Sequence, residues 1–221
     1  MLDITGSLKD SIASLSKLLD VKHKVLPISE DSSLTLMAKD YDGNVIEGES
    51  EITEAHRKFE KIYYKKEPKV LPEVIKAIEE ADLIIFSMGS LYTSILPNVI
   101  CKQVKKALSK TKSKIMYLCN AVTQPGETDG FTVSDHINLI NSYLEHKKID
   151  VVVTSNTNIK EEIVKKYETE EQKDLVKIDY KNIKKTGAEL IEDDLIVIED
   201  NTIRHNSLKL SSLIFSYLMR N

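Results

Sequence analysis

Two apolar segments, each followed by a polar loop, lie close together in residues 81–132. Residues 83–88 read LIIFSM and lead into the loop GSLYTS, and residues 114–119 read KIMYLC and lead into the loop NAVTQPGETDG. A helical pattern separates the two units. Successive strand–loop–helix units place both loops at the carboxyl end of a parallel sheet, where open α/β sheets bind ligands. This stretch therefore predicts both the fold class and the position of a site.

The residues on either side of this stretch continue the alternation of strands and helices. Continuous apolar strands flanked by helices indicate a mostly parallel sheet with helices on both faces. Further strands are expected at residues 149–156, 175–180 and 188–200. Helices are expected at residues 8–19, 72–78, 96–108, 134–145, 159–167 and 207–219, with a Lys-rich turn near 181–187. Ser7 is the expected N-cap of the first helix, and Pro72 suits the first turn of the second.

Residues 21–66 have a different character and predict a small antiparallel β subdomain within one domain of residues 1–221. Short segments with partial alternation of apolar and polar residues are expected as strands at 23–29, 33–40, 44–52 and 58–66. Asp42, Gly43 and Asn44 indicate a hairpin turn.

Composition and charge exclude several classes of protein. The formal net charge is −4, and the lysines and arginines are scattered, which argues against nucleic-acid binding. No apolar run approaches the roughly 20 residues of a membrane span, and the first residues lack the features of a secretory signal. Cys101 and Cys119 form no CxxC pair, so we expect reduced thiols in a cytoplasmic protein. The histidines show no metal-ligand spacing.

The first loop suggests an anion seat. Gly89 allows backbone amides to approach a ligand, a helix N-terminus favours anions, and Ser90, Thr93 and Ser94 add hydroxyl donors. An ordinary βα turn with polar residues explains the same spacing equally well. Asn98, early in the next helix, can either cap backbone groups or reach the ligand.

The second loop is longer than a connection of this kind usually needs. Its carboxylates can accept hydrogen bonds from sugar hydroxyls, hold a hydrated Mg²⁺ beside phosphates, or act as a general base. The alternative is a surface loop whose polar groups bond to one another. The candidate ligand-binding residues here are Asn120, Thr123, Gln124, Glu127 and Thr128, with Glu127 and Asp129 as catalytic candidates if the protein is a transferase.

Two further polar groups are ambiguous. Asp135 and His136 begin the following helix, but a Ser–His–Asp arrangement with Ser90 or Ser94 lacks a nucleophile elbow. Arg204, His205 and Asn206 precede the last helix, either as a cap or as a polar end near the site.

At these residues the chain resembles the YvcK group of the CofD-like superfamily, the gluconeogenesis factors. The strings that carry the resemblance are GSLYTSILPN and CNAVTQPGETDGFTVSDH, with VLPISEDSSLTL, DGNVIEGES, ADLIIFSMGS and IRHN. They cover essentially the whole chain. The resemblance implies a Rossmann-like fold and binding of a nucleotide-sugar of the UDP-N-acetylglucosamine type. It also implies a role in central carbon use and cell-wall morphogenesis in bacteria.

The chain departs from the family pattern in two places. Family members typically read GPGS where this chain has Ser87-Met88-Gly89-Ser90. The family also begins with a strand and a GGGTG loop, followed by a DDGGSSG-type segment, and neither is present. We therefore expect this chain to correspond to the C-terminal part of the family fold. Missing strands would expose an apolar sheet edge, so we expect a homo-oligomer or a poorly stable chain.

Three functions follow from the resemblance and the loops. The first is a non-catalytic regulator that binds a nucleotide-sugar through both loops. The second is a CofD-like transferase of a phospho group from a nucleotide-linked donor, with Mg²⁺ near Glu127 or Asp129. The third is an inactive remnant or interaction module.

Overall fold

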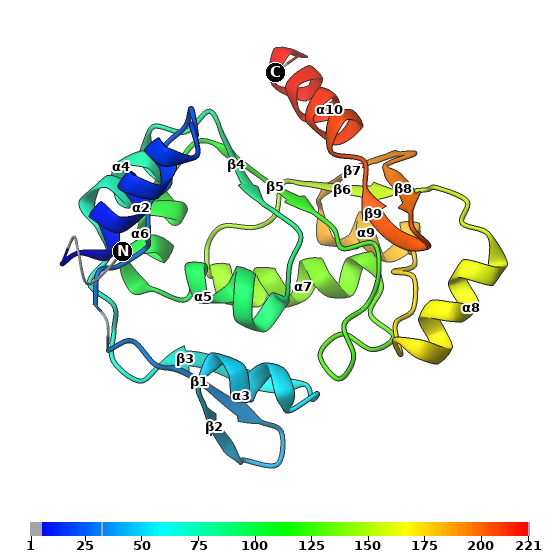
Figure 1. Ribbon diagram of the computed structural model, residues 1–221, viewed down its shortest axis with the longest axis horizontal. Helices are drawn as coiled ribbons and strands as arrows, with labels where there is room; N and C mark the ends of the chain where they lie inside the picture. Colours follow the sequence, from blue (N-terminus) through cyan, green and yellow to red (C-terminus); the bar gives the residue numbers. More distant parts are fainter. Residues whose placement is uncertain (1–5, 32, 221) are drawn as a thin grey trace.

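The computed structural model describes residues 6–31 and 33–220, and a four-stranded parallel sheet lies at its centre (Figure 1). The order of the strands in space follows their order in the chain, and every neighbouring pair is parallel. The strands are β4 (Leu83–Phe86), β5 (Lys114–Leu118), β6 (Val151–Ser155) and β7 (Glu189–Asp193). The parallel sheet predicted from residues 81–132 is confirmed.

This sequential order decides how the two faces are covered. Right-handed crossovers between consecutive neighbours place all connecting helices on one face. Ile115, Tyr117 and Val152 point to that face, and Met116 and Val151 point to the other. The helices packed on the first face are α5 (Leu96–Val99), α6 (Lys102–Lys110), α7 (Val133–Leu144) and α9 (Tyr180–Thr186).

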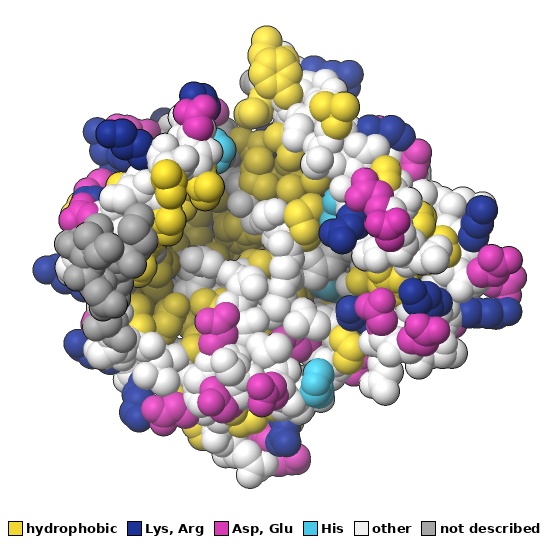
Figure 2. Space-filling model, in the orientation of Figure 1, with side chains coloured by type: hydrophobic (Ala, Val, Ile, Leu, Met, Phe, Trp, Pro, Cys, Tyr) yellow, Lys and Arg dark blue, Asp and Glu magenta, His cyan; other side chains and the backbone are white. Residues whose placement is uncertain are grey.

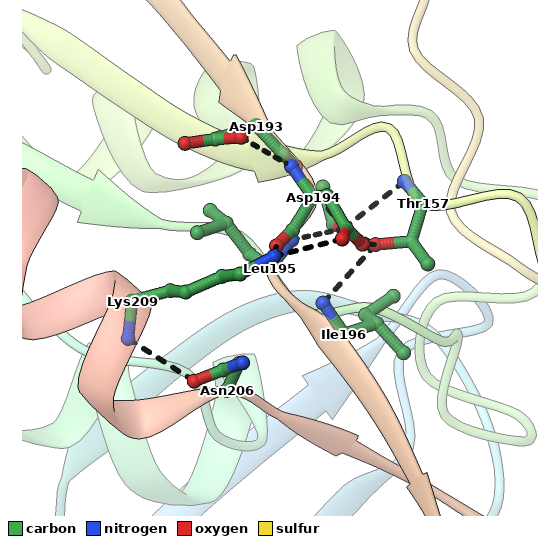
Figure 3. A network of polar contacts seen from close by, with 8 residues as sticks. Thr157, Asp193, Asp194, Leu195, Ile196, Asn206 and Lys209 are labelled. Atoms are coloured by element: carbon green, nitrogen blue, oxygen red, sulfur yellow. Dashed lines mark hydrogen bonds and ion pairs between the residues drawn. The ribbon is translucent and has the colours of Figure 1, made fainter.

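The opposite face is covered by the last helix, α10 (Ser207–Arg220), which buries Leu210 and Tyr217 against it. A polar network holds the start of this helix to the sheet (Figure 3). Lys209 pairs with Asp194 at 2.8 Å, and the Asp194 carboxylate accepts a 2.6 Å hydrogen bond from Thr157. The hairpin of β8 (Ile196–Glu199) and β9 (Thr202–His205) carries the chain to this face. Helices therefore lie on both faces, as predicted.

The antiparallel subdomain predicted at residues 21–66 is present as a three-stranded sheet in the order β2-β1-β3. Its strands are β1 (Leu36–Asp40), β2 (Val45–Glu47) and β3 (Phe59–Tyr64), with α3 (Glu49–Glu54) between the last two. Two tyrosine hydroxyls join it to the helices, because the Phe59 amide donates to Tyr92 and the Ile62 amide to Tyr143. Both parts share one hydrophobic core.

The remaining helices flank these sheets. Ser7 caps the first of them, and Pro72 begins another, both as the sequence predicted. They are α2 (Leu8–Leu18), α4 (Pro72–Glu79), the π-helical turn η1 (Leu91–Ile95) and α8 (Glu161–Glu170).

Two predicted strands are wrong. Residues 23–29 form no strand and contribute an isolated bridge from Ser29 to Val70. Residues 175–180 are not a strand of the sheet, because their backbone groups bond to the loop after β5 instead. The Val176 amide donates to the Ala121 carbonyl at 3.0 Å, and bridges join Leu175 to Val122 and Lys177 to Thr132.

Three helical regions also differ from the prediction. The helix expected at 96–108 is divided, because Cys101 adopts an extended backbone and the Glu67 carboxylate accepts from the Lys102 amide, which starts α6 anew. Helix α3 replaces the second half of the strand expected at 44–52, and α9 replaces the Lys-rich turn.

Strand β4 lies at the edge of the large sheet, and Ile85 on it is 39% exposed. The predicted apolar edge is therefore present, while the self-association expected from it stays a prediction. Both cysteines are free and buried. Within the described ranges, no helix has both the length and the apolar character needed to cross a bilayer. The prediction about a secretory signal falls partly on residues 1–5, which lie outside the described residues.

The start of α7 provides a test of the fold. Thr132 and Asp135 form a reciprocal capping box. Replacement Thr132→Ala removes the side-chain acceptor of the Asp135 amide, and we expect the free energy of unfolding to fall by about 1 kcal/mol. Urea denaturation measures this. Thr169→Ala, on the exposed side of α8, is the control and should change stability by less than about 0.5 kcal/mol; equal losses in both variants would contradict the role of the cap.

Candidate functional site

The loop after β4 is held in place by an amide from the loop after β5. The Gly89 amide donates to Asn120 Oδ1 at 3.0 Å, and Asn120 Nδ2 donates to the Gly89 carbonyl at 2.9 Å. Parallel pairing of β4 and β5 brings the two strand ends together, so a single Asn side chain can satisfy both backbone groups. Asn120, predicted as a ligand-binding residue, thus fixes the position of the first loop.

A buried carboxylate makes the second connection between the loops. Glu127 is 1% exposed and accepts hydrogen bonds from the Ser90 hydroxyl at 2.9 and 3.0 Å. Ser90 in turn accepts from the Thr93 hydroxyl at 2.8 Å and from the Thr93 amide at 3.1 Å. Gln124 Nε2 donates to Glu127 at 3.2 Å. Four predicted site residues therefore form one network.

Burial raises the pKa of the Glu127 carboxyl, although hydrogen bonds from the Ser90 hydroxyl and the Tyr92 amide act in the opposite direction. Tyr92 and Thr93 belong to the first turn of η1, where backbone amides lack helical partners. The predicted anion seat at this helix start is thus occupied by groups of the chain itself. A ligand anion at the sheet edge must bind beside this network, where Gly89 and Ser90 face the cavity.

The rest of the second loop is largely self-bonded. The Gln124 amide donates to the Thr128 hydroxyl at 2.8 Å, and the Gly126 amide donates to the Asp129 carboxylate at 2.8 Å. Thr123 and Asp174 exchange hydrogen bonds at 2.8 and 2.9 Å, which ties the loop to residues 175–178. The length of the loop is therefore explained in part by its own turns and by the segment packed beside it.

The small antiparallel sheet contacts the second loop at Gly126. This glycine has a φ of +78°, and a Cβ built on it would lie 1.9 Å from the carbonyl carbon of His56. His56 itself follows α3, and its Nδ1 lies 3.2 Å from the Pro125 carbonyl. Only a glycine permits this approach of two backbones, which brings His56 to the edge of the site.

A cavity of about 540 Å³ opens between the two loops at the carboxyl ends of β4 and β5. Its volume lies within the range of about 300–1,000 Å³ that is usual for ligand pockets. The lining combines hydroxyls, amides and basic groups with a few apolar side chains. The lining residues are Thr53, His56, Met88, Gly89, Ser90, Asn120, Ala121, Val122, Thr123, Gln124, Pro125, Lys173, Ile203 and His205.

The nine predicted ligand-binding residues divide into three groups. Five of them line the cavity: Gly89, Ser90, Asn120, Thr123 and Gln124. Glu127, Thr128 and Thr93 lie behind the lining and hold the loops. Asn98 lies elsewhere, because its side chain donates to the Ser94 carbonyl and borders a separate apolar groove.

Three basic residues of the lining were not predicted as binding residues. His56 comes from the connection between α3 and β3, Lys173 from the segment after α8, and His205 from the end of β9. For residues 204–206 the sequence left two alternatives, a cap of the last helix or a polar group near the site. Each alternative holds for a different residue. His205 lines the cavity, while Asn206 Oδ1 caps α10 by accepting from the Lys209 amide. Burial lowers the pKa of His205, which favours its neutral form.

The carboxylates near the loops already accept hydrogen bonds from groups of the chain. Both Glu127 oxygens accept hydrogen bonds from Ser90, and Asp129 is exposed and bonded to the Gly126 amide. Throughout residues 6–31 and 33–220, no group of three or more His, Cys, Asp or Glu side chains converges in a metal-binding arrangement.

Comparison with known proteins supplies the relationships of the chain. The model of the family described as 2-phospho-L-lactate transferase CofD matches residues 1–196. A gluconeogenesis factor from Bacillus subtilis is 38% identical over 99% of this chain, which covers 68% of that protein. A relative from Thermotoga maritima is 42% identical over 96% of the chain, which covers 67% of it. A relative from Clostridium acetobutylicum is 38% identical over 98% of this chain, which covers 49% of that protein.

Solved structures agree with these relationships. A crystal structure from Bacillus halodurans, described as a member of the UPF0052 family, has a TM-score of 0.90 and 35% sequence identity. It is matched by 96% of this chain, which covers 69% of that chain. The chain therefore spans about half to just over two-thirds of the length of its relatives.

The contact between Gly126 and His56 gives a first prediction for the site. Gly126→Ala should lower the free energy of unfolding by roughly 3 kcal/mol or more, because a Cβ would enter the His56 backbone. Gly130→Ala is the matched control: Gly130 also has a positive φ of +69°, but nothing lies within 4 Å of its Cβ position. Gly130→Ala should lower the free energy of unfolding by about 1 kcal/mol. Chemical denaturation separates the two, and equal costs would refute the close contact.

The raised pKa of Glu127 predicts a pH dependence of stability. Folding favours its protonated form, so the stabilisation is complete below the unfolded value near 4.5 and is lost as the pH rises through the raised pKa. Glu127→Gln removes this titration. Melting temperatures measured in steps from pH 4 upward should fall more for the parent chain than for the variant. If the melting temperatures of the two chains changed equally with pH, ionisation of Glu127 would have no effect on stability, which would contradict the prediction.

Proposed function

Because the chain belongs to the CofD family, we propose that it binds a nucleotide-sugar of the UDP-N-acetylglucosamine type and acts as a regulator of gluconeogenic carbon metabolism. The cavity between the two loops carries this proposal. It lies where open parallel sheets place their ligands, outside the carboxyl ends of the strands. The name gluconeogenesis factor, borne by the Bacillus subtilis relative, supports the metabolic part. A link to cell-wall morphogenesis belongs to the same proposal.

The chemistry of the lining suits the parts of such a ligand. Lys173, His56 and His205 supply hydrogen-bond donors for a diphosphate, with Lys173 held in place by a 2.8 Å ion pair to Glu171. The hydroxyl of Thr53 suits a sugar hydroxyl. Met88, Val122 and Ile203 offer apolar contact to a base ring. Because the two loops are already bonded to each other, little ordering is needed when the ligand binds.

A transferase reaction is the second candidate, and the match to a family described as 2-phospho-L-lactate transferase favours it. Burial raises the pKa of Glu127, the carboxyl group that connects the two loops, but its oxygens are engaged by Ser90 and Gln124. The binding function therefore accounts for more of the site than the transfer reaction does.

Calorimetry with UDP-N-acetylglucosamine tests the proposal. We expect Lys173→Gln and His205→Gln each to weaken binding by about tenfold, since each removes a donor to the ligand, equivalent to about 1.4 kcal/mol. Lys184→Gln, on the exposed side of α9, is the control and should leave the affinity unchanged. Separate titrations with UDP and with N-acetylglucosamine 1-phosphate measure how much each end of the ligand contributes to the affinity. Absence of binding, or equal affinity in all variants, would refute the proposal.

A further inference from the structure

His205 lies at the boundary of two cavities. It lines the cavity between the loops and also a small internal cavity of about 10 Å³, which has room for about one water molecule. Ile203 lines the larger cavity too, whereas Arg204 pairs with Glu199 at 3.6 Å. Because side chains alternate along a strand, β9 turns Ile203 and His205 toward the same side. The strand is held there by the Ile203 amide, which donates to the Tyr167 hydroxyl at 2.8 Å.

The imidazole of His205 has no hydrogen-bond partner among residues 6–31 and 33–220. The other histidine of the lining is different, since His56 Nδ1 lies 3.2 Å from the Pro125 carbonyl and the side chain is exposed. Figure 2 shows, in the orientation of Figure 1, that histidine side chains reach the surface beside β9. Both ring nitrogens of His205 are therefore available to a ligand.

The cavity offers His205 no negative charge. Lys173 and His56 share the lining with it, and none of the described residues of the lining is Asp or Glu. The carboxylates closest to these two residues lie outside the lining. Glu171 pairs with Lys173 at 2.8 Å, and Glu127 interacts electrostatically with His56.

The elements packed behind His205 are neutral or already paired. Cys119 borders the small cavity, and burial raises the pKa of its thiol to about 12, so it is uncharged at neutral pH. At the start of α10, Lys209 pairs with Asp194 at 2.8 Å. Within the described residues, no charged group offsets the burial of His205, and burial is what lowers its pKa.

The two forms of the imidazole suit two states of the cavity. A neutral imidazole has one donor and one acceptor nitrogen, whereas the protonated ring has two donors and a positive charge. Burial favours the neutral form in the empty cavity. An anion beside the ring favours the protonated form, because it supplies both acceptors and the missing negative charge.

We propose that an anionic ligand binds in this cavity together with one proton from solvent, and that an imidazole nitrogen of His205 holds the proton. This inference rests on the proposed function, since the anion is the diphosphate of the nucleotide-sugar. A diphosphate that is esterified at both ends has no proton to exchange near neutral pH. The proton taken up on binding is therefore assigned to the protein.

The proposal fixes the direction of a pH dependence. The pKa of His205 is low in the free chain and rises in the complex, so binding takes up protons between the two values. The affinity is then highest in acid and falls as the pH rises through this range. A rise of about one unit in the pKa makes the affinity at pH 8 about threefold weaker than at pH 6.

Calorimetry with UDP-N-acetylglucosamine in two buffers of different ionisation enthalpy tests the proposal. The difference between the two binding enthalpies gives the number of protons taken up. We expect about half a proton for each ligand bound at pH 6, decreasing toward zero at pH 8. His205→Gln should abolish the uptake, because an amide side chain does not titrate.

Two other histidine variants are the controls. His146→Gln, at an exposed position outside the cavity, should change neither the affinity nor the uptake. His56→Gln removes a donor from the lining but should retain the uptake. Loss of the uptake in His56→Gln, with retention in His205→Gln, would assign the proton to His56 and overturn the proposal.

Nuclear magnetic resonance of the parent chain gives a measurement that does not depend on the variant's folding. The C2 proton of each histidine reports its own pKa, and we expect that of His205 to rise when UDP-N-acetylglucosamine is added. An unchanged pKa of His205, or binding without proton uptake, would overturn this proposal while leaving the binding function intact. Absence of binding at every pH would refute both.

Discussion

The buried carboxylate of Glu127 connects the elements on which the site depends. It accepts from Ser90 of the first loop and from Gln124 of its own loop, while Asn120 bonds both backbone groups of Gly89. A buried polar group without partners is costly, so each of these bonds constrains the others. Because both loops are fixed in this way, the cavity between them has a defined shape before any ligand arrives.

The sequential order of the parallel strands sets a second constraint. Right-handed crossovers place the connecting helices on one face, so the other face relies on α10, held by Lys209 and Asp194. The same order leaves β4 at an edge beside an apolar groove. The candidate cavity lies at the carboxyl ends of β4 and β5, whereas the groove runs along the free side of β4. The two surfaces thus share one strand.

Much of the fold could be predicted because apolar runs, turn residues and caps act locally. The strands around residues 84, 116 and 152, the hairpin at Gly43 and the caps at Ser7 and Pro72 all follow from such patterns. Residues 175–180 have the apolar pattern of a strand, but their partners lie in the loop after β5, which local pattern does not reveal. The candidate site was predicted in part for the same reason: its loops are contiguous in sequence, whereas His56, Lys173 and His205 come from distant segments.

The sequence by itself determined the α/β class, the parallel sheet and the two loops at its carboxyl edge, because strand periodicity and loop composition are properties of neighbouring residues. Only the tertiary structure decided what the loop residues do. Glu127 and Thr128 were predicted to face a ligand, and in the folded chain their polar groups bond to the loops themselves. Asn120 lines the cavity and also bonds to the first loop. A polar side chain bonds to the groups nearest to it in space, and the strands that bring Gly89 to Asn120 and Ser90 to Glu127 lie more than thirty residues apart.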